Sequence, residues 1–246
     1  MNHKHLRQFT GLLFIAGAIF VNIPYTLLIM NFNYPDILRQ PAGVVLTQFQ
    51  AGGAGLIFTW LAFAWAGLPL FVGMILYPRV SGGSRSTLVK AATITGIIAF
   101  LVQVIGLLRW VFVVPVLAQM YVNPAASDSA RETAVIVFQT IHQFGGVVLG
   151  EHMGQLFSIA WTGLLCLAAW RHGYFPRWLA GFGIASGLVY LLAQTELLAT
   201  VIPGFPVVAE AGLAGSLLWL LWIVGLGVML LRPSTTAVTH PSITFS

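Results

Sequence analysis

The sequence has 246 residues, of which 58% are hydrophobic and only 7% are charged, with a formal net charge of +5. Soluble domains average about half apolar and about a quarter charged residues, so this composition excludes an ordinary soluble domain and predicts a multi-span membrane protein. The basic balance does not indicate a nucleic-acid partner. The Arg and Lys residues stand singly at the ends of apolar segments rather than in clusters with aromatic residues.

Apolar stretches that can cross about 30 Å of hydrocarbon at about 1.5 Å per residue predict six transmembrane helices. They are Phe9–Met30, Ala51–Tyr77, Ala91 to about Val114, Met153–Trp170, Trp178 to about Leu198, and Ala211–Leu231. The first stretch is too long for a signal-peptide core and no small-residue cleavage site follows it, so it is expected to remain as a helix. The predicted fold class is an all-α polytopic membrane bundle, with one transmembrane domain over residues 1–232. A disordered cytoplasmic tail, rich in Ser, Thr and Pro, is expected over residues 233–246.

Residues 133–150 are uncharged and raise the question of a seventh span. A seventh crossing would place Arg171 and Arg177 outside, against the rule that basic residues stay inside. Polar and small residues such as Gln139 and His142 recur on one side with helical spacing. This pattern predicts an amphipathic helix that lies along the outer surface or is re-entrant.

The Arg and Lys residues also indicate the orientation of the bundle. With the amino terminus in the cytoplasm, eight of the eleven fall inside and all six carboxylates fall outside, so both termini are expected to be cytoplasmic. The inner basic residues are Lys4, Arg7, Arg79, Arg85, Lys90, Arg171, Arg177 and Arg232. The outer ones are Arg39, Arg109 and Arg131.

Charged side chains are predicted to gather in one layer near the outer boundary. Arg109 lies nineteen residues after Lys90, and Glu151 lies twenty before Arg171. On straight helices each therefore lies about one bilayer thickness from the inner boundary. Arg109 is expected to pair with a carboxylate of this layer rather than point into lipid. The candidate ligand-binding residues are Arg39, Arg109, His142, Glu151, His152, Glu196 and Glu210.

This layer has two main interpretations. In the first, the charged groups cap helix ends, extend to lipid headgroups and pair with one another. In the second they line a pocket, in which Arg39 and Arg109 hold an anionic group. The carboxylates and His152 would then pair with these arginines or recognise a cationic part of the ligand, and the helix that carries His142 would act as a cover.

No metal site and no cofactor are predicted. Glu151 and His152 are adjacent on a helix and point about 100° apart, and the i, i+4 histidine pair of a zinc helix is absent. A metal would need a third ligand from Glu196, Glu210 or His142. Haem is disfavoured because His142 and His152 lie in series on one segment rather than on facing spans.

An ion-coupled carrier is disfavoured because ionisable groups are missing from the middle of the predicted spans. The notable polar residues there are Asn22, Tyr25, Thr26 and Gln103.

Three motifs resemble a known family. They are YPDILRQPAG (Tyr34–Gly43) before a Gly-rich helix opening, GEHMG (Gly150–Gly154), and GYFPRWL (Gly173–Leu179). They are similar to segments of an uncharacterised family of bacterial multi-pass membrane proteins, catalogued only as a domain of unknown function. The resemblance covers nearly the whole chain. It implies a location in the bacterial cytoplasmic membrane and assigns no catalytic residue.

The leading hypothesis is an integral membrane protein whose outer polar layer binds a small amphipathic ligand, such as a lipid headgroup, or a partner membrane subunit. A second hypothesis is a membrane-embedded metal-assisted hydrolase that uses Glu151 and His152. A third is a structural or accessory subunit whose charges only anchor it.

Overall fold

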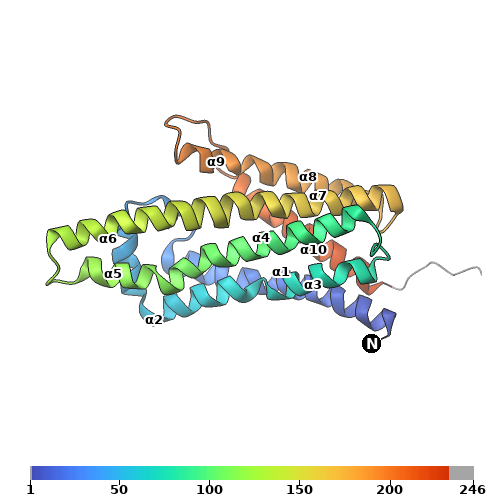
Figure 1. The fold of residues 1–246 in the computed structure, drawn as a ribbon, viewed down its shortest axis with the longest axis horizontal. Coiled ribbons are helices and arrows are strands. Elements are labelled where there is room, and N and C mark those ends of the chain that lie inside the picture. Colours follow the sequence, from blue (N-terminus) through green and yellow to red (C-terminus); the bar gives the residue numbers. More distant parts are fainter. Residues whose placement is uncertain (1, 233–246) are drawn as a thin grey trace, which may run out of the picture.

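The computed structural model describes residues 2–232, and this part of the chain folds into helices without strands (Figure 1). Six helical stretches are long and apolar enough to cross a membrane, so the predicted all-α, six-span class is confirmed. They are His3–Phe32, Ala42–Val80, Thr87–Val122, Asp128–His172, Arg177–Ala199 and Ala211–Leu231. The chain is therefore a multi-pass membrane protein. The predicted tail over residues 233–246 lies outside the described residues.

Most spans contain more than one helical element. In chain order the elements are α1 (His3–Phe32), the short 3-10 helix η1 (Asp36–Arg39), α2 (Ala42–Ala66), α3 (Leu68–Val80), α4 (Thr87–Phe112), α5 (Val114–Val122), α6 (Asp128–Ile141), the π-helix η2 (His142–Met153), α7 (Gly154–His172), α8 (Arg177–Leu192), α9 (Gln194–Ala199) and α10 (Ala211–Leu231). The start of α1 and the end of α10 lie at one end of the bundle (Figure 1). The opposite end, where η1 and the α5–α6 and α9–α10 connections lie, is called the η1 end.

Local sequence signals explain where several elements begin and end. Proline lacks an N–H group and is tolerated in a first helical turn, and Pro69 and Pro115 lie at the starts of α3 and α5. The side chains of Ser86 and Ser127 cap α4 and α6 by accepting hydrogen bonds from backbone N–H groups. Gly173 ends α7 in the left-handed conformation, with φ of 71°.

Residues 133–150 differ from the expected surface helix. They belong to α6 and η2, and η2 continues directly into α7, so that one helical stretch runs from Asp128 to His172 (Figure 1). The reason is close packing against α4. A Cβ atom built at Gly106 would lie 2.6 Å from the Gly145 carbonyl oxygen and 2.8 Å from the Gly150 Cα atom. Gly106, Gly145 and Gly150 thus let two long helices approach each other closely.

The second span begins earlier than predicted. It starts at Ala42 rather than Ala51, and its backbone leaves the helical conformation at Gly53, where φ is 56° and ψ is −153°. Only glycine adopts such a conformation readily. The chain changes direction there (Figure 1), and the preceding segment buries Leu46 and Phe49 at the η1 end.

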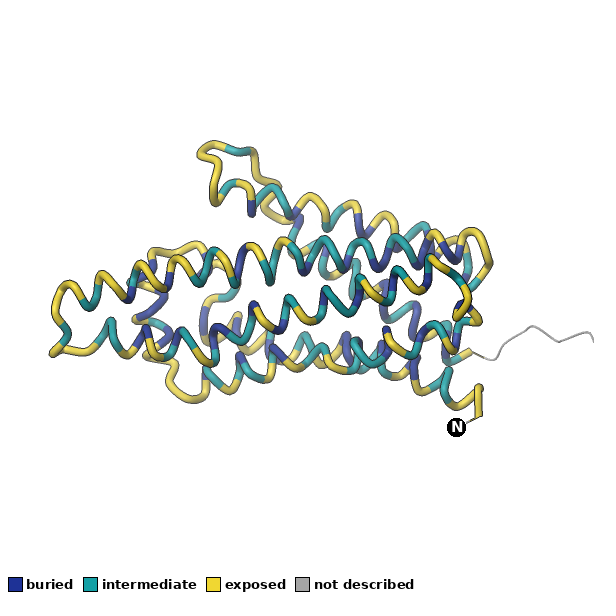
Figure 2. The backbone as a smooth tube through the Cα atoms, viewed as in Figure 1, coloured by how far each residue is buried: buried dark blue, intermediate teal, exposed yellow. Residues whose placement is uncertain are grey.

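The buried side chains form two clusters along the bundle. One surrounds Trp161 and Trp222 in the half nearer the chain ends, and the other surrounds Trp60 and Trp110 in the half nearer η1. The rings of Trp60 and Trp110 stack with centroids 4.7 Å apart and an interplanar angle of 9°. Large apolar side chains such as Phe58 are exposed, and exposed residues follow the outward faces of the helices (Figure 2). This distribution is that of a bundle surrounded by lipid.

The predicted orientation can be tested at two exposed serines at opposite ends of the bundle. In a background where the buried Cys166 is replaced by Ala, Ser127→Cys is expected to react with an impermeant thiol reagent added to intact cells. Ser84→Cys is expected to react only after the membrane is opened. The expectation follows from the eight-to-three distribution of basic residues. Reversed labelling would overturn the orientation.

The close contact between α4 and η2 predicts that a side chain added at this crossing lowers the stability of the fold, whereas one added at an open position does not. Gly106→Ala is expected to lower the unfolding temperature in detergent, because its Cβ meets backbone atoms that cannot rotate away. Gly163→Ala is the matched control, since the same atom would meet nothing within 4 Å. There the gain in helix propensity, about 0.5–1 kcal/mol, is expected to leave stability equal or higher. Equal effects of both changes would contradict the packing.

Candidate functional site

A cavity of about 320 Å³ lies inside the bundle toward the η1 end. Its walls come from α1, η1, α2, α4, η2, α7, α8, α9 and α10. Apolar residues make up much of the wall, but several polar and charged side chains also reach it. Those from the charged layer are Arg39, Arg109, Glu151 and Glu196. Ligand sites in proteins are commonly concave, largely apolar and supplied with a few polar groups, as here.

Arg39 connects three elements at one edge of this cavity. Its Nη2 donates to Oε2 of Glu151 at 2.7 Å, and its Nε donates to Oε1 of Glu196 at 2.9 Å. Burial by itself lowers the pKa of Arg39, but the charges and hydrogen bonds of the two carboxylates outweigh burial and raise the pKa above its ordinary value. Arg39 is therefore held as a cation between two anions of the protein itself.

Arg109 has a different environment. Its side chain is buried, and one guanidinium nitrogen, Nη1, donates to the carbonyl oxygen of Gly106. The guanidinium carbon lies 5.1 Å from the ring centroid of Trp110, within cation–π distance. Space for the group depends on Gly146, because a Cβ atom there would lie 2.5 Å from Nη2.

The expectation that Arg109 pairs with a carboxylate is wrong for the described part of the chain. Among residues 2–232, no Asp or Glu oxygen lies within ion-pair distance of Arg109, and its Nε atom has no hydrogen-bond partner. The physical reason is competition: Glu151 and Glu196 are both engaged by Arg39. A buried charge without a counter-charge costs several kcal/mol, so this arrangement requires an explanation.

Further polar atoms at the cavity lack partners. Within residues 2–232 the indole nitrogens of Trp60 and Trp110 and the Oε1 atom of Glu151 are buried and make no hydrogen bond. By contrast, the indole nitrogens of Trp219, which also lines the cavity, and of Trp222 both donate, at 2.8 and 3.1 Å. Buried polar groups are normally satisfied, so the unpaired buried atoms of these wall residues distinguish this half of the bundle.

Tyr34 adds a phenol group to the same wall. Burial, followed by the negative charge of Glu151, raises the pKa of Tyr34 above its ordinary value. The phenol is therefore neutral at physiological pH and retains its O–H group as a donor. Its ring packs edge-on against Trp60, with centroids 5.4 Å apart. The wall is thus richer in unpaired donors than in acceptors.

Three predicted site residues do not line the cavity. His142 stacks on Phe138 with centroids 5.4 Å apart, and neither of its ring nitrogens makes a hydrogen bond of normal geometry within residues 2–232. His152 is exposed, and its Nδ1 atom lies 2.5 Å from Oε1 of Gln194. Glu210 is exposed directly before α10. As ligand-binding residues, all seven candidates remain predictions.

Sequence reasoning missed several residues of the wall. Tyr34, Trp60, Tyr190 and Trp219 line the cavity but were not proposed as site residues. Aromatic side chains in a membrane sequence are also expected as core and as interfacial anchors, so their spacing alone does not mark a site. Tyr34 was the most accessible signal, since it opens the YPDILRQPAG motif.

The geometry gives no support to a metal-assisted hydrolase. Across residues 2–232, no three His, Cys, Asp or Glu side chains lie close enough to share a metal ion. Glu151 pairs with Arg39, whereas His152 turns to Gln194, so the two adjacent residues serve different partners.

Comparison with known proteins gives a family and no activity. The family described as "Domain of unknown function (DUF4386)" matches residues 9–227. No curated protein and no solved structure matches the chain.

The double pairing of Arg39 predicts that it stabilises the η1 end. Arg39→Ala is expected to lower the unfolding temperature clearly, because it leaves Glu151 and Glu196 without their shared counter-charge. Arg131→Ala is the matched control: its pair with Asp128 is 3.9 Å long, and the Asp128 side chain is 97% exposed. An exposed pair of this kind contributes about 0–1 kcal/mol. If thermal denaturation gave equal, small shifts for both variants, the bridging role of Arg39 would be wrong.

Proposed function

For this chain, which belongs to the DUF4386 family of unknown function, we propose that the cavity binds the anionic headgroup of a small amphipathic ligand. The observation that carries the proposal is the buried guanidinium of Arg109, which has no carboxylate partner among residues 2–232 and lines the cavity. An anion placed against it would supply the missing counter-charge. Arginine is well suited to this task because its planar group matches carboxylate and phosphate oxygens.

The surrounding donors support an anion rather than a cation. The free Nε–H of Arg109, the indole N–H groups of Trp60 and Trp110, and the Tyr34 hydroxyl belong to residues of the same wall. Arg39 already pairs with Glu151 and Glu196 and so holds the carboxylates of the wall in place. We therefore assign it this structural role in place of the anion-binding role first predicted. Its bridge engages Glu151 and Glu196, and neither carboxylate forms an ion pair with Arg109.

The ligand is amphipathic because apolar residues make up much of the remaining wall. Phe63, Leu107, Leu213 and Leu217 line the cavity together with the polar groups. A fully hydrated inorganic anion would leave these surfaces without a matching group, whereas an amphipath satisfies both kinds of wall. On the predicted orientation, the cavity lies in the outer half of the membrane.

This proposal predicts opposite effects of one substitution on stability and on binding. Without ligand, Arg109→Met is expected to raise the unfolding temperature in detergent, because it removes an uncompensated buried charge while retaining most of the volume. Each 1 kcal/mol gained corresponds to about 2–4 °C for a chain of this size. A decrease would show that Arg109 is already compensated.

The binding half of the test uses a short-chain anionic probe, dihexanoyl phosphatidylglycerol, and its zwitterionic counterpart, dihexanoyl phosphatidylcholine. At about one hundred times its dissociation constant, a bound probe stabilises the fold by about 2.7 kcal/mol. The wild type and Arg131→Ala are expected to be stabilised by the anionic probe and much less by the zwitterionic one. Arg109→Met is expected to lose the response. An unchanged response in Arg109→Met would overturn the proposed function.

A further inference from the structure

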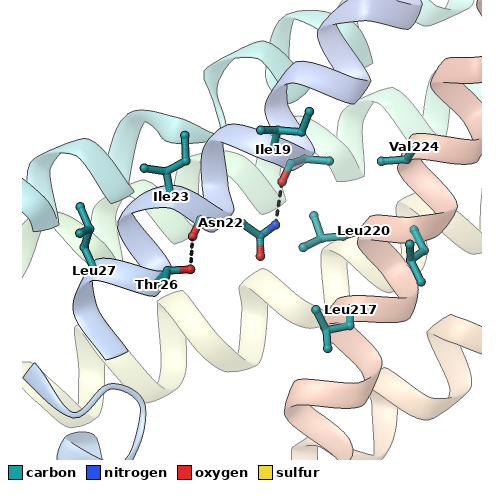
Figure 3. A pocket seen from close by; sticks show the side chains of 10 residues that line it. Ile19, Asn22, Ile23, Thr26, Leu27, Leu217, Leu220 and Val224 are labelled. Carbon is teal, nitrogen blue, oxygen red and sulfur yellow. Dashed lines mark hydrogen bonds between the residues drawn. The ribbon is translucent and has the colours of Figure 1, made fainter. Parts of the chain in front are cut away.

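A second concave surface, a groove of about 640 Å³, lies between α1 and α10 (Figure 3). Its walls are formed by one face of each helix, and Asn22 of α1 extends toward Leu220 of α10 across the open space (Figure 3). The α1 wall extends from Ala18 to Leu27, about 14 Å at 1.5 Å per residue. The α10 wall extends from Leu217 to Val224.

The groove exists because α1 and α10 touch closely elsewhere. Gly11 and Gly227 pack backbone to backbone, since a Cβ atom on either would lie 2.7 Å from the carbonyl oxygen of the other. Arg7 tightens this contact by donating to the carbonyl oxygens of Met229 and Arg232, at 2.9 and 2.6 Å. Toward the η1 end the facing residues are large, and the helices leave space between them.

The groove wall is mostly apolar, and its polar side chains bond to the backbone of their own helix. Of its ten lining residues, only Asn22 and Thr26 are polar. The Asn22 amide donates to the Ala18 carbonyl oxygen at 2.8 Å, and the Thr26 hydroxyl donates to the Asn22 carbonyl oxygen at 2.8 Å (Figure 3). Each of these side chains thus directs one donor to the α1 backbone, and the groove offers mainly hydrocarbon contact.

The groove and the cavity adjoin each other. Asn22, Leu217 and Leu220 line both spaces, so the α1–α10 side of the bundle leads toward the cavity of Arg109. Ile19, Ile23 and Leu221 are 54–60% exposed, as expected for a groove that faces the surrounding lipid.

We infer that the ligand is an anionic membrane lipid that enters sideways between α1 and α10, with a hydrocarbon chain in the groove and its headgroup in the cavity. The inference rests on the proposed function, because the charge of Arg109 identifies the headgroup as anionic. A cation without an ion pair among residues 2–232, in a cavity that adjoins an apolar groove, matches the two chemical parts of such a lipid. A lipid of this kind reaches the cavity from within the membrane without passing through water.

The test uses the protein in nanodiscs that contain a phosphatidylglycerol with a photoreactive diazirine in the middle of one acyl chain. Cross-linked peptides are mapped by mass spectrometry for the wild type, Ile23→Trp, Leu12→Trp and Arg109→Met. Ile23 lies in the groove and is 56% exposed, whereas Leu12 lies on the same helix outside the groove and is 54% exposed. The second variant therefore controls for a bulky, lipid-facing substitution on α1.

The wild type and Leu12→Trp are expected to give cross-links concentrated on the two groove walls. Ile23→Trp is expected to lose them by filling the groove, and Arg109→Met by removing the headgroup site. The same nanodiscs with diazirine-labelled phosphatidylcholine are expected to give no such concentration. Unfolding temperatures of all variants establish that each is folded.

Two outcomes would overturn this inference while leaving the proposed function intact. One is uniform cross-linking over all lipid-facing surfaces of the wild type. The other is groove labelling that persists in Arg109→Met although this variant has lost its thermal response to the short-chain anionic probe. The proposed function fails separately, through an unchanged response of Arg109→Met to that probe.

Discussion

The buried positive charge of Arg109, which forms no ion pair within residues 2–232, is the constraint on which the η1 half of the bundle depends. A guanidinium inside a helical bundle needs space, hydrogen-bond acceptors and a counter-charge. Gly146 provides the space, the Gly106 carbonyl provides one acceptor, and the face of Trp110 provides a further favourable contact. Within residues 2–232 no carboxylate forms an ion pair with Arg109, because Arg39 engages both Glu151 and Glu196. Both arginines were predicted to bind an anionic group, but Arg39 pairs with two carboxylates, whereas Arg109 forms no ion pair within residues 2–232.

The space around Arg109 depends on the close packing of α4 against η2, which glycines at their crossing allow. Gly106, Gly145 and Gly150 let the two helices approach until backbone atoms meet. The π-helical backbone of η2 extends over the same stretch. π-Helical turns are rare in proteins, but those that occur are frequently found at functional sites. Glu151 lies in this element, so the position of the carboxylate that binds Arg39 depends on the same contact as the space for Arg109. Packing and electrostatics at the site are therefore coupled.

The sequence predicted the six spans because hydrocarbon thickness fixes the minimum length of an apolar helix. Counting residues from the basic inner boundary also brought Arg109, Glu151, Glu196 and Glu210 to one depth, and the loop of Arg39 was placed at the same level. Of these residues, Glu210 does not line the cavity and the others do. The choice of partner could not be predicted, because it depends on side-chain directions that depth does not specify. This is why Arg109 was expected to be paired and was found without a carboxylate among residues 2–232.

The segment 133–150 shows a second limit of periodicity. A polar and small stripe on one helical face is expected both for a helix on the membrane surface and for a helix that packs that stripe against a neighbour. In the structure Gly145 and Gly150 contact α4, so the stripe packs against a neighbouring helix. His142 belonged to that stripe, and it packs against Phe138 and Trp110 rather than facing the cavity. A pattern on one helix does not reveal which partner covers it.

The cavity and the groove imply different contributions to recognition. When a hydrocarbon chain moves from the lipid into the groove, it exchanges one apolar environment for another. The groove therefore adds little selectivity for chain length. The cavity has unpaired donors and an unpaired cation, and a site of this kind discriminates strongly against a ligand that lacks the complementary group. Selectivity is therefore expected to follow headgroup charge rather than chain structure. Arg109, which is expected to lower the stability of the empty fold, is then also expected to distinguish the ligand from the bulk lipids of the membrane.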